Sequence, residues 1–132
     1  MILGLGMDVV EIGRIARILD GPPRLAERFL ARVFTPGERE ACDGRRDRAA
    51  AYAARFAAKE AGYKALAVVP NARWRDFEVV RPPGSAPALV LGGAAAAAAE
   101  VRGVSRVHLT LTHDGGVAAA TVILEGAAGE GA

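Results

Sequence analysis

One segment restricts the fold of this chain more than any other: the residues from about Arg48 to Val68 have the pattern of a single long helix. The pattern stops before Pro70-Asn71, because proline cannot continue a helix. Alanines and aromatic residues surround its few charged positions, which is typical of a half-buried helix. Shorter helices are expected before this segment and most of the strands after it. This order favours an α+β fold over a doubly wound parallel sheet.

Apolar periodicity and turn residues place the other elements. Before the long helix we expect one strand and three helices: Ile2–Val10, about Glu11–Leu19, Arg24–Arg32, and a short helix that Thr35 and Glu38 begin as a capping box. After it we expect a strand pair, an alanine-rich helix and a hairpin: Asp76–Arg81 and Ala88–Leu91, the segment from Gly92-Gly93 to Arg102-Gly103, and Val107–His113 with Val117–Leu124. Residues 1–125 are predicted to form one domain, and residues 126–132 a disordered Gly/Ala tail.

The core is expected to be small. The chain has 132 residues and 52% of them are hydrophobic, but many of these are alanine and only 5% are aromatic. This length fits one domain, and we expect part of its stability to come from contacts between subunits. The single Cys42 cannot form an internal disulfide, and the sequence shows neither a secretory signal nor an apolar run of membrane-spanning length. We therefore expect a cytoplasmic protein with no membrane partner.

Charge is distributed unevenly along the chain. Seventeen Lys and Arg against 15 Asp and Glu give a formal net charge of +2, which does not indicate binding to nucleic acid. Residues 12–32, however, hold five arginines against Asp20 and Glu27, whereas residues 107–132 hold no Lys or Arg. The five are Arg14, Arg17, Arg24, Arg28 and Arg32. A basic surface is therefore expected near the N-terminus, where it suits an acidic partner.

The chain contains two lysines, Lys59 and Lys64, and they flank Glu60 in the long helix. An ammonium group is a compact, strongly hydrated charge, which suits a crowded site holding phosphate oxygens and a metal. Glu60 and Lys64 lie about 40° apart around the helix, while Arg55 and Lys59 share another stripe. The two stripes are expected to contact different parts of a long anionic ligand. The alternative is an i, i+4 pair of Glu60 and Lys64 that only stabilises the helix.

Asp8 and His113 are the other candidate site residues. Asp8 lies where an apolar strand ends and a helix follows, so it is either a cap or turn residue or a metal ligand. His113 continues the apolar face of its strand into a glycine turn. It is either a buried, hydrogen-bonded histidine or a contact to phosphate, since backbone N–H groups in such a turn favour anions. Two carboxylates, a lysine and a histidine fit magnesium better than zinc.

Three motifs follow one another along the chain: Gly4-Leu-Gly6-Met-Asp8-Val-Val-Glu11-Ile-Gly-Arg14-Ile15, Arg55-Phe-Ala-Ala-Lys59-Glu60-Ala-Gly-Tyr-Lys64-Ala-Leu66 and Leu109-Thr-Leu-Thr-His113-Asp114. In this order they resemble the holo-acyl-carrier-protein synthase family, the small trimeric type of 4′-phosphopantetheinyl transferase. The resemblance spans about residues 1–125. It implies one domain with a long central helix packed on an antiparallel sheet. It also implies a homotrimer whose active sites lie between neighbouring subunits.

Such a family moves the 4′-phosphopantetheine of coenzyme A to a serine of an apo acyl carrier protein and releases adenosine 3′,5′-bisphosphate. By position, the resemblance implies that Asp8 and Glu60 hold Mg²⁺. Lys64 and His113 would neutralise the transferring phosphate. Either Glu60 or a metal-bound water would accept the serine proton. Lys59 would serve a peripheral phosphate or the fold.

The resemblance also implies contacts to the rest of both substrates. Arg55, with Arg48 or a neighbouring arginine, would hold the 3′-phosphate or other phosphates of coenzyme A, and Asp114 accompanies His113 in the cofactor motif. Arg14, Arg17, Arg24 and Arg28 would face the acidic recognition helix of the carrier protein. One departure stands out: the family has a glycine-rich loop after Lys-Ala-Leu, whereas residues 67–72 contain no glycine. We expect that loop to take a different course.

The alternative function is a non-catalytic basic α+β module that binds coenzyme A, an acidic protein or RNA through its arginine helices. This hypothesis leaves the placement of Asp8, Glu60 and Lys64 unexplained. RNA binding also usually involves exposed aromatic side chains that stack on bases, and Trp74 is the one tryptophan in the chain. Transfer to a carrier protein is therefore the preferred hypothesis.

Overall fold

The computed structural model describes residues 1–67 and 69–128, and its elements follow the order expected from the sequence. They are β1 (Ile2–Glu11), α1 (Ile12–Leu19), α2 (Pro23–Val33), α3 (Pro36–Asp43), α4 (Arg48–Ala65), the short 3-10 helix η1 (Trp74–Asp76), β2 (Phe77–Val80), β3 (Ala88–Leu91), α5 (Gly93–Val101), β4 (Val104–Asp114) and β5 (Val117–Gly126). Helices dominate the first half and paired strands the second. The α+β prediction is confirmed.

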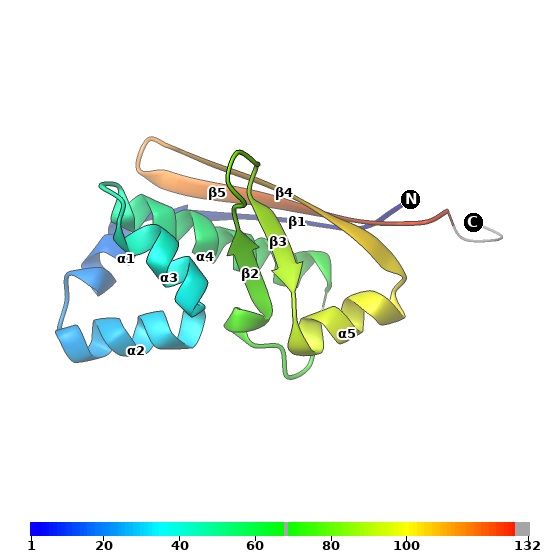
Figure 1. Cartoon of the computed structure of the whole chain (residues 1–132), viewed down its shortest axis with the longest axis horizontal. Helices are drawn as coiled ribbons and strands as arrows, with labels where there is room; N and C mark the ends of the chain where they lie inside the picture. The colour runs from blue at the N-terminus through cyan, green and yellow to red at the C-terminus, as the bar shows by residue number, and fades with distance from the viewer. Residues whose placement is uncertain (68, 129–132) are drawn as a thin grey trace.

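The strands form two antiparallel sheets. The larger has the order β1-β5-β4, and the smaller is the β2-β3 hairpin. Figure 1 shows α4 running along the larger sheet, with α3 and the β2-β3 hairpin on the other side of this helix. The helix is therefore enclosed between two layers, as its alanine-rich sequence predicts. No helix among the described residues is long and apolar enough to cross a membrane.

Close packing of β1 on α4 depends on small residues at the contact. A Cβ atom added to Gly6 would overlap the carbonyl oxygen of Ala61, and one added to Gly4 would overlap that of Ala65. Ala118 of β5 is fully buried on the same side of the sheet. Glycine and alanine thus let the backbones of strand and helix approach one another directly. This contact fixes where β1 presents its polar side chains.

The opposite face of the larger sheet is uncovered. Alternation along β1 points Leu5, Met7 and Val9 away from α4, and these side chains are 64%, 58% and 54% exposed. On β5, Thr121 and Ile123 lie beside them in register and are partly exposed. A contiguous apolar face of this kind on a folded protein is typical of a surface that another protein covers.

Three boundaries differ from the sequence predictions. Helix α4 ends at Ala65 because Leu66 takes the cap position and Ala67 the left-handed conformation, with φ of 64°. The predicted end, Val68, lies outside the described residues. Strand β4 starts at Val104 rather than Val107, and β5 continues to Gly126, where its ends are paired with the N-terminus. The predicted tail therefore begins later than residue 126, and residues 129–132 lie outside the described part.

Candidate functional site

Asp8, Glu60 and Lys64 form one cluster where β1 crosses α4. The Nζ of Lys64 donates hydrogen bonds to Oδ1 of Asp8 at 3.0 Å and to the carbonyl oxygen of Met7 at 3.1 Å. Burial raises the pKa of Glu60, and the nearby negative charge of Asp8 raises it further, against the opposing charges of Lys64 and Arg14. The structure thus brings together three residues that the sequence separates by more than 50 positions.

The cluster suits a hard divalent cation. Two carboxylates that repel each other electrostatically, as Asp8 and Glu60 do, are stabilised when a cation lies between them. Mg²⁺ typically takes one or two carboxylates and completes its shell with water and phosphate oxygens. Among the described residues no group of three or more His, Cys, Asp or Glu side chains is gathered as a metal site. The donor set therefore fits magnesium with substrate oxygens, as predicted, rather than a closed protein cage.

A pocket of about 370 Å³ opens beside Glu60. Its walls come from α4, the loop that follows and β2: Tyr63, Ala72, Arg73, Trp74 and Phe77. Most of this lining is apolar, with Glu60 and Arg73 as charged groups at its edge. Tyr63 and Trp74 were not assigned a role from the sequence, although Tyr63 flanks the Glu60 stripe at helical spacing. The pocket gives the carboxylate cluster a partly enclosed ligand space.

Arg55 and His113 lie in a second pocket of about 260 Å³, which Arg45, Arg81 and Pro87 also line. Arg55 is 8% exposed, and its Nε has no hydrogen-bond partner among the described residues. A buried guanidinium group with an unused donor is a ready anion site. His113 is half exposed, and its Nε2 is 4.0 Å from Oδ2 of Asp47. The alternative of a buried histidine is therefore wrong, because the end of β4 extends beyond the helix that covers the sheet.

Within one chain these two groups of residues are apart. Asp8 is paired with Ala120 of β5, whereas His113 is paired with Ala118 from the other side of that strand. Two strand spacings, about 10 Å, separate β1 from β4 at this point. On α4, Arg55 precedes Glu60 by five residues, a rotation of about 140°. The expected separation of the Arg55 stripe from the Glu60 stripe is thus confirmed.

Lys59 does not share the ligand-facing role expected for the Arg55 stripe. Its side chain is fully buried, and its Nζ donates to Oε1 of Glu38 and to the carbonyl oxygen of Phe77, both at 2.6 Å. The hypothesis of a contact to ligand was wrong for Lys59. The cause is the α3 helix, which covers this turn of α4 and brings Glu38 against it. Of the two roles left open for Lys59, the structure supports the fold.

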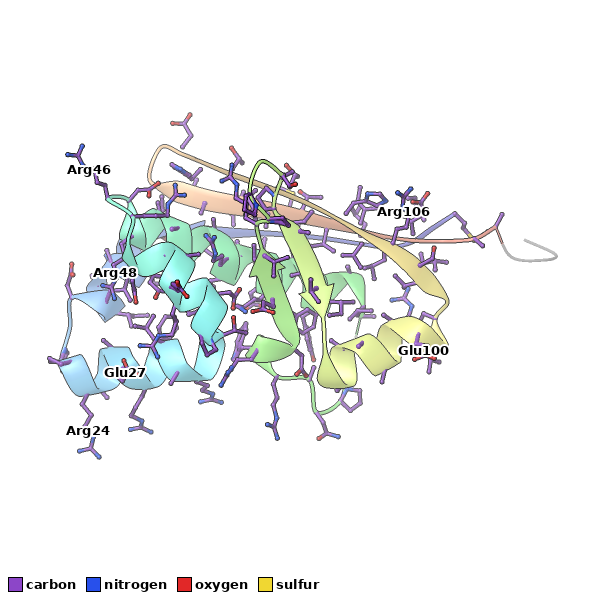
Figure 2. All side chains as sticks on the ribbon, viewed as in Figure 1. Arg24, Glu27, Arg46, Arg48, Glu100 and Arg106 are labelled. Carbon is purple, nitrogen blue, oxygen red and sulfur yellow. The ribbon has the colours of Figure 1, made fainter. Side chains whose placement is uncertain are left out.

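The remaining predicted residues lie at the surface. Nε of Arg48 donates to Asp43 at 2.9 Å, and its guanidinium lies over the Tyr52 ring, so Arg45 rather than Arg48 lines the Arg55 pocket. Asp114 accepts a hydrogen bond from the Gly115 N–H in the turn. The predicted docking arginines are exposed on α1 and α2: Arg14, Arg17, Arg24 and Arg28. Arg24 extends from α2 away from the rest of the molecule (Figure 2).

Arg81 and Arg73 are site residues that the sequence analysis missed. Arg81 follows β2 and lines the Arg55 pocket, and Arg73 lies at the edge of the Glu60 pocket. Both belong to connections with no helical or strand periodicity, so only their positive charge was visible. The arginine-rich composition made that signal unspecific.

The fold and the site define a class: a small α+β protein with a carboxylate pair and lysine suited to a divalent cation and phosphate groups. The chain belongs to the 4′-phosphopantetheinyl transferase superfamily, whose family model matches residues 4–122. The resemblance found in the sequence is thereby confirmed.

Similar proteins carry one name. A holo-[acyl-carrier-protein] synthase of Anaeromyxobacter dehalogenans is 68% identical over 126 residues, covering 96% of this chain and 98% of that protein. The crystal structure of the synthase from Neisseria meningitidis has a TM-score of 0.82 at 29% identity, covering 95% of this chain and 99% of the other. The Helicobacter pylori synthase, in complex with coenzyme A, has a TM-score of 0.77 at 27% identity and covers 92% and 99%.

Proposed function

We propose that this chain transfers the 4′-phosphopantetheine group of coenzyme A to a serine of an apo acyl carrier protein. The products are the holo-carrier protein and adenosine 3′,5′-bisphosphate. The observation that carries the proposal is the Asp8–Glu60–Lys64 cluster at the β1–α4 crossing, in a member of this superfamily. The similar synthase of Helicobacter pylori is a complex with coenzyme A, which supports the choice of cofactor.

Asp8 and Glu60 would hold Mg²⁺, which supplies positive charge to pyrophosphate oxygens and polarises the phosphorus for attack. Lys64 is already within hydrogen-bond distance of Asp8, and its flexible stem lets the ammonium turn to a phosphate oxygen. Glu60 suits the role of proton acceptor for the serine hydroxyl, because its raised pKa makes it a stronger base than an ordinary carboxylate. Positioning and charge stabilisation thus supply most of the catalysis.

The other half of coenzyme A would lie in the Arg55 pocket. The unpartnered Nε of Arg55 and the exposed ring of His113 provide donors for phosphate oxygens. Arg45 and Arg81 add positive charge at the same hollow. Arg48 and Asp114 would complete its rim, although each has an internal partner when no ligand is bound.

We assign the two halves of each site to neighbouring subunits of a homotrimer. Two observations support this arrangement: the Asp8 cluster and the Arg55 pocket are apart within one chain, and the outer face of the larger sheet is apolar and uncovered. Packing of that face against its copies in other subunits would bury Leu5, Met7 and Val9. The small alanine-rich core gives a physical reason for the association, because the subunit contacts add buried apolar area.

The basic surface of α1 and α2 would dock the carrier protein. Arg14 is close enough to Glu60 to lower its pKa, so a partner on α1 would bring its serine near the carboxylate cluster. Acidic residues on a recognition helix complement these arginines and steer association. The reaction is placed in the cytoplasm, in keeping with the free, buried thiol of Cys42.

The test is a transfer reaction. The purified chain, coenzyme A, Mg²⁺ and an apo carrier protein are mixed, and the intact carrier is weighed by mass spectrometry. A mass increase equal to one phosphopantetheine, dependent on Mg²⁺, is expected. No increase with fatty-acid, polyketide and peptide-synthesis carriers would refute the proposal and favour the non-catalytic binding module.

A further inference from the structure

Three arginines outside the proposed docking and cofactor residues gather where α2 meets η1. Arg32 lies at the end of α2, and Arg73 and Arg75 lie on either side of Trp74. All three are exposed and line one hollow of about 410 Å³, together with Ala31 and Ala72. We refer to Arg32, Arg73 and Arg75 as the η1 arginines.

The η1 arginines have no acidic partner in the part of the chain that the structure describes. Carboxylates on the same elements are engaged elsewhere. Glu27 of α2 pairs with Arg39 at 2.7 Å, and Asp76 of η1 accepts a hydrogen bond from the backbone N–H of Arg73. Three guanidinium groups around a hollow without a counter-charge present a complementary surface for carboxylates or phosphates.

The position of the η1 arginines links two surfaces already described. Arg24, Arg28 and Arg32 follow one another at four-residue spacing, so they lie along one side of α2. At the other end, Arg73 also lines the pocket beside Glu60. Positive charge therefore continues from α2 past η1 to the carboxylate cluster. Since Arg14 acts on Glu60 from α1, the cluster has basic groups from two sides.

We infer that the η1 arginines bind a second acidic segment of the carrier protein, so that this substrate contacts both α2 and η1 around the Glu60 site. The inference rests on the proposed function. A partner seated on one helix alone can pivot, whereas contacts from two elements fix the orientation in which its serine approaches Glu60. Trp74, partly exposed between Arg73 and Arg75, provides an apolar contact at the centre of this surface.

The experiment measures binding without turnover. The full-length chain is titrated by calorimetry with an apo carrier protein whose acceptor serine is replaced by alanine. Arg32→Gln, Arg73→Gln and Arg75→Gln are compared singly and together. Val101→Glu is the matched control for a single variant, because it also lowers the net charge by one, at a side chain that is 88% exposed at the far end of α5.

We expect each single variant to raise the carrier Kd about 2- to 5-fold and the triple variant at least about 10-fold, with the difference shrinking in high salt. In transfer assays the triple variant should raise the KM for carrier protein while its KM for coenzyme A stays within about 2-fold. Val101→Glu should leave the carrier Kd unchanged.

Failure of the inference is separable from failure of the proposed function. An unchanged carrier Kd in the triple variant, or a wild type that does not bind the carrier, overturns the inference. A raised KM for coenzyme A alone would assign the hollow to the cofactor and also overturn it. Binding of a labelled single-stranded RNA that the triple variant loses, with carrier binding intact, would assign the surface to RNA instead. The proposed function itself fails only if the wild type adds no phosphopantetheine.

Discussion

The ammonium of Lys59 and the carboxylate of Glu38 form an ion pair at 2.6 Å, and neither side chain is exposed to solvent. Glu38 also accepts hydrogen bonds from the backbone N–H groups of Thr35 and Val79, both at 3.0 Å. One carboxylate thus joins α3, α4 and β2. This junction holds the layer that covers α4 opposite the larger sheet.

Lys59→Met is expected to destabilise the protein strongly, because it leaves the Glu38 charge buried without its cation. Breaking a buried pair costs about 3–5 kcal/mol, which lowers the midpoint of thermal unfolding by at least about 10 °C in a domain of this size. Lys64→Met, at the half-exposed lysine, should abolish transfer with little change in that midpoint. Calorimetry and transfer assays on both variants check this. Equal unfolding midpoints for the two variants would contradict the assigned roles.

Glu60→Gln should lose transfer activity by at least about 100-fold, as the loss of a group that stabilises transition-state charge does, yet unfold at a higher temperature than the wild type at pH 7–8. Burial and Asp8 raise the pKa of Glu60 in the folded chain, so its charged form is disfavoured there. The stability associated with the protonated form is complete below the unfolded value near 4.5 and is lost as pH rises through the raised pKa. The advantage of the glutamine variant should therefore vanish below about pH 4.5.

Magnesium provides a second readout for the same variant. Addition of Mg²⁺ should raise the unfolding midpoint of the wild type, because a ligand that binds only the folded state stabilises it. Glu60→Gln should show a smaller rise. An equal response of both proteins to Mg²⁺ would remove Glu60 from the metal site.

Gly6→Ala should separate β1 from α4. The new methyl group would overlap the Ala61 carbonyl oxygen, which is backbone and cannot move away alone. We expect a loss of stability of about 1–3 kcal/mol, together with lower activity because Asp8 is displaced from Glu60. Gly44→Ala is the control, since nothing lies within 4 Å of its added Cβ and its φ of −82° suits alanine. Similar urea midpoints for the two variants would disprove this account of the contact.

Mixing inactive subunits tests the shared site. Lys64→Met and Arg55→Met should each be inactive, but unfolding and refolding them together should restore about a quarter of wild-type activity, because a random mixture pairs two intact halves at one site in four. Lys64→Met mixed with Glu60→Gln should restore nothing, since both changes lie in the same half. Absence of recovery in the first mixture would mean that both halves belong to one chain.

Met7→Asp should weaken association of the subunits. The side chain is 58% exposed on the outer face of the larger sheet, and a charge there would be buried without a partner in the trimer. Sedimentation velocity is expected to show trimers for the wild type and smaller species for Met7→Asp. Val101→Asp, also at an exposed apolar side chain, should remain trimeric. A monomeric wild type would refute the assembly itself.

The sequence by itself determined the local structure. Helical and strand periodicities gave the order of elements, and Thr35 with Glu38 predicted a capping box that the structure contains. These features depend on residues within one or two turns of each other, where spacing alone decides which groups meet. The Glu60–Lys64 stripe belongs to the same category. Boundaries failed where the local signal was weak, as at the end of α4, where an alanine takes a left-handed conformation.

Tertiary structure decided the roles of residues that look alike in sequence. Lys59 and Lys64 flank the same glutamate, yet α3 covers one and buries it against Glu38, while β1 places Asp8 against the other. Burial and charge partners come from segments 21 and 56 residues away, and no periodicity within α4 encodes them. The sequence located the chemistry on one helix. The packing of α3 and β1 on opposite sides of that helix determined which lysine stabilises the fold and which is free to meet a phosphate.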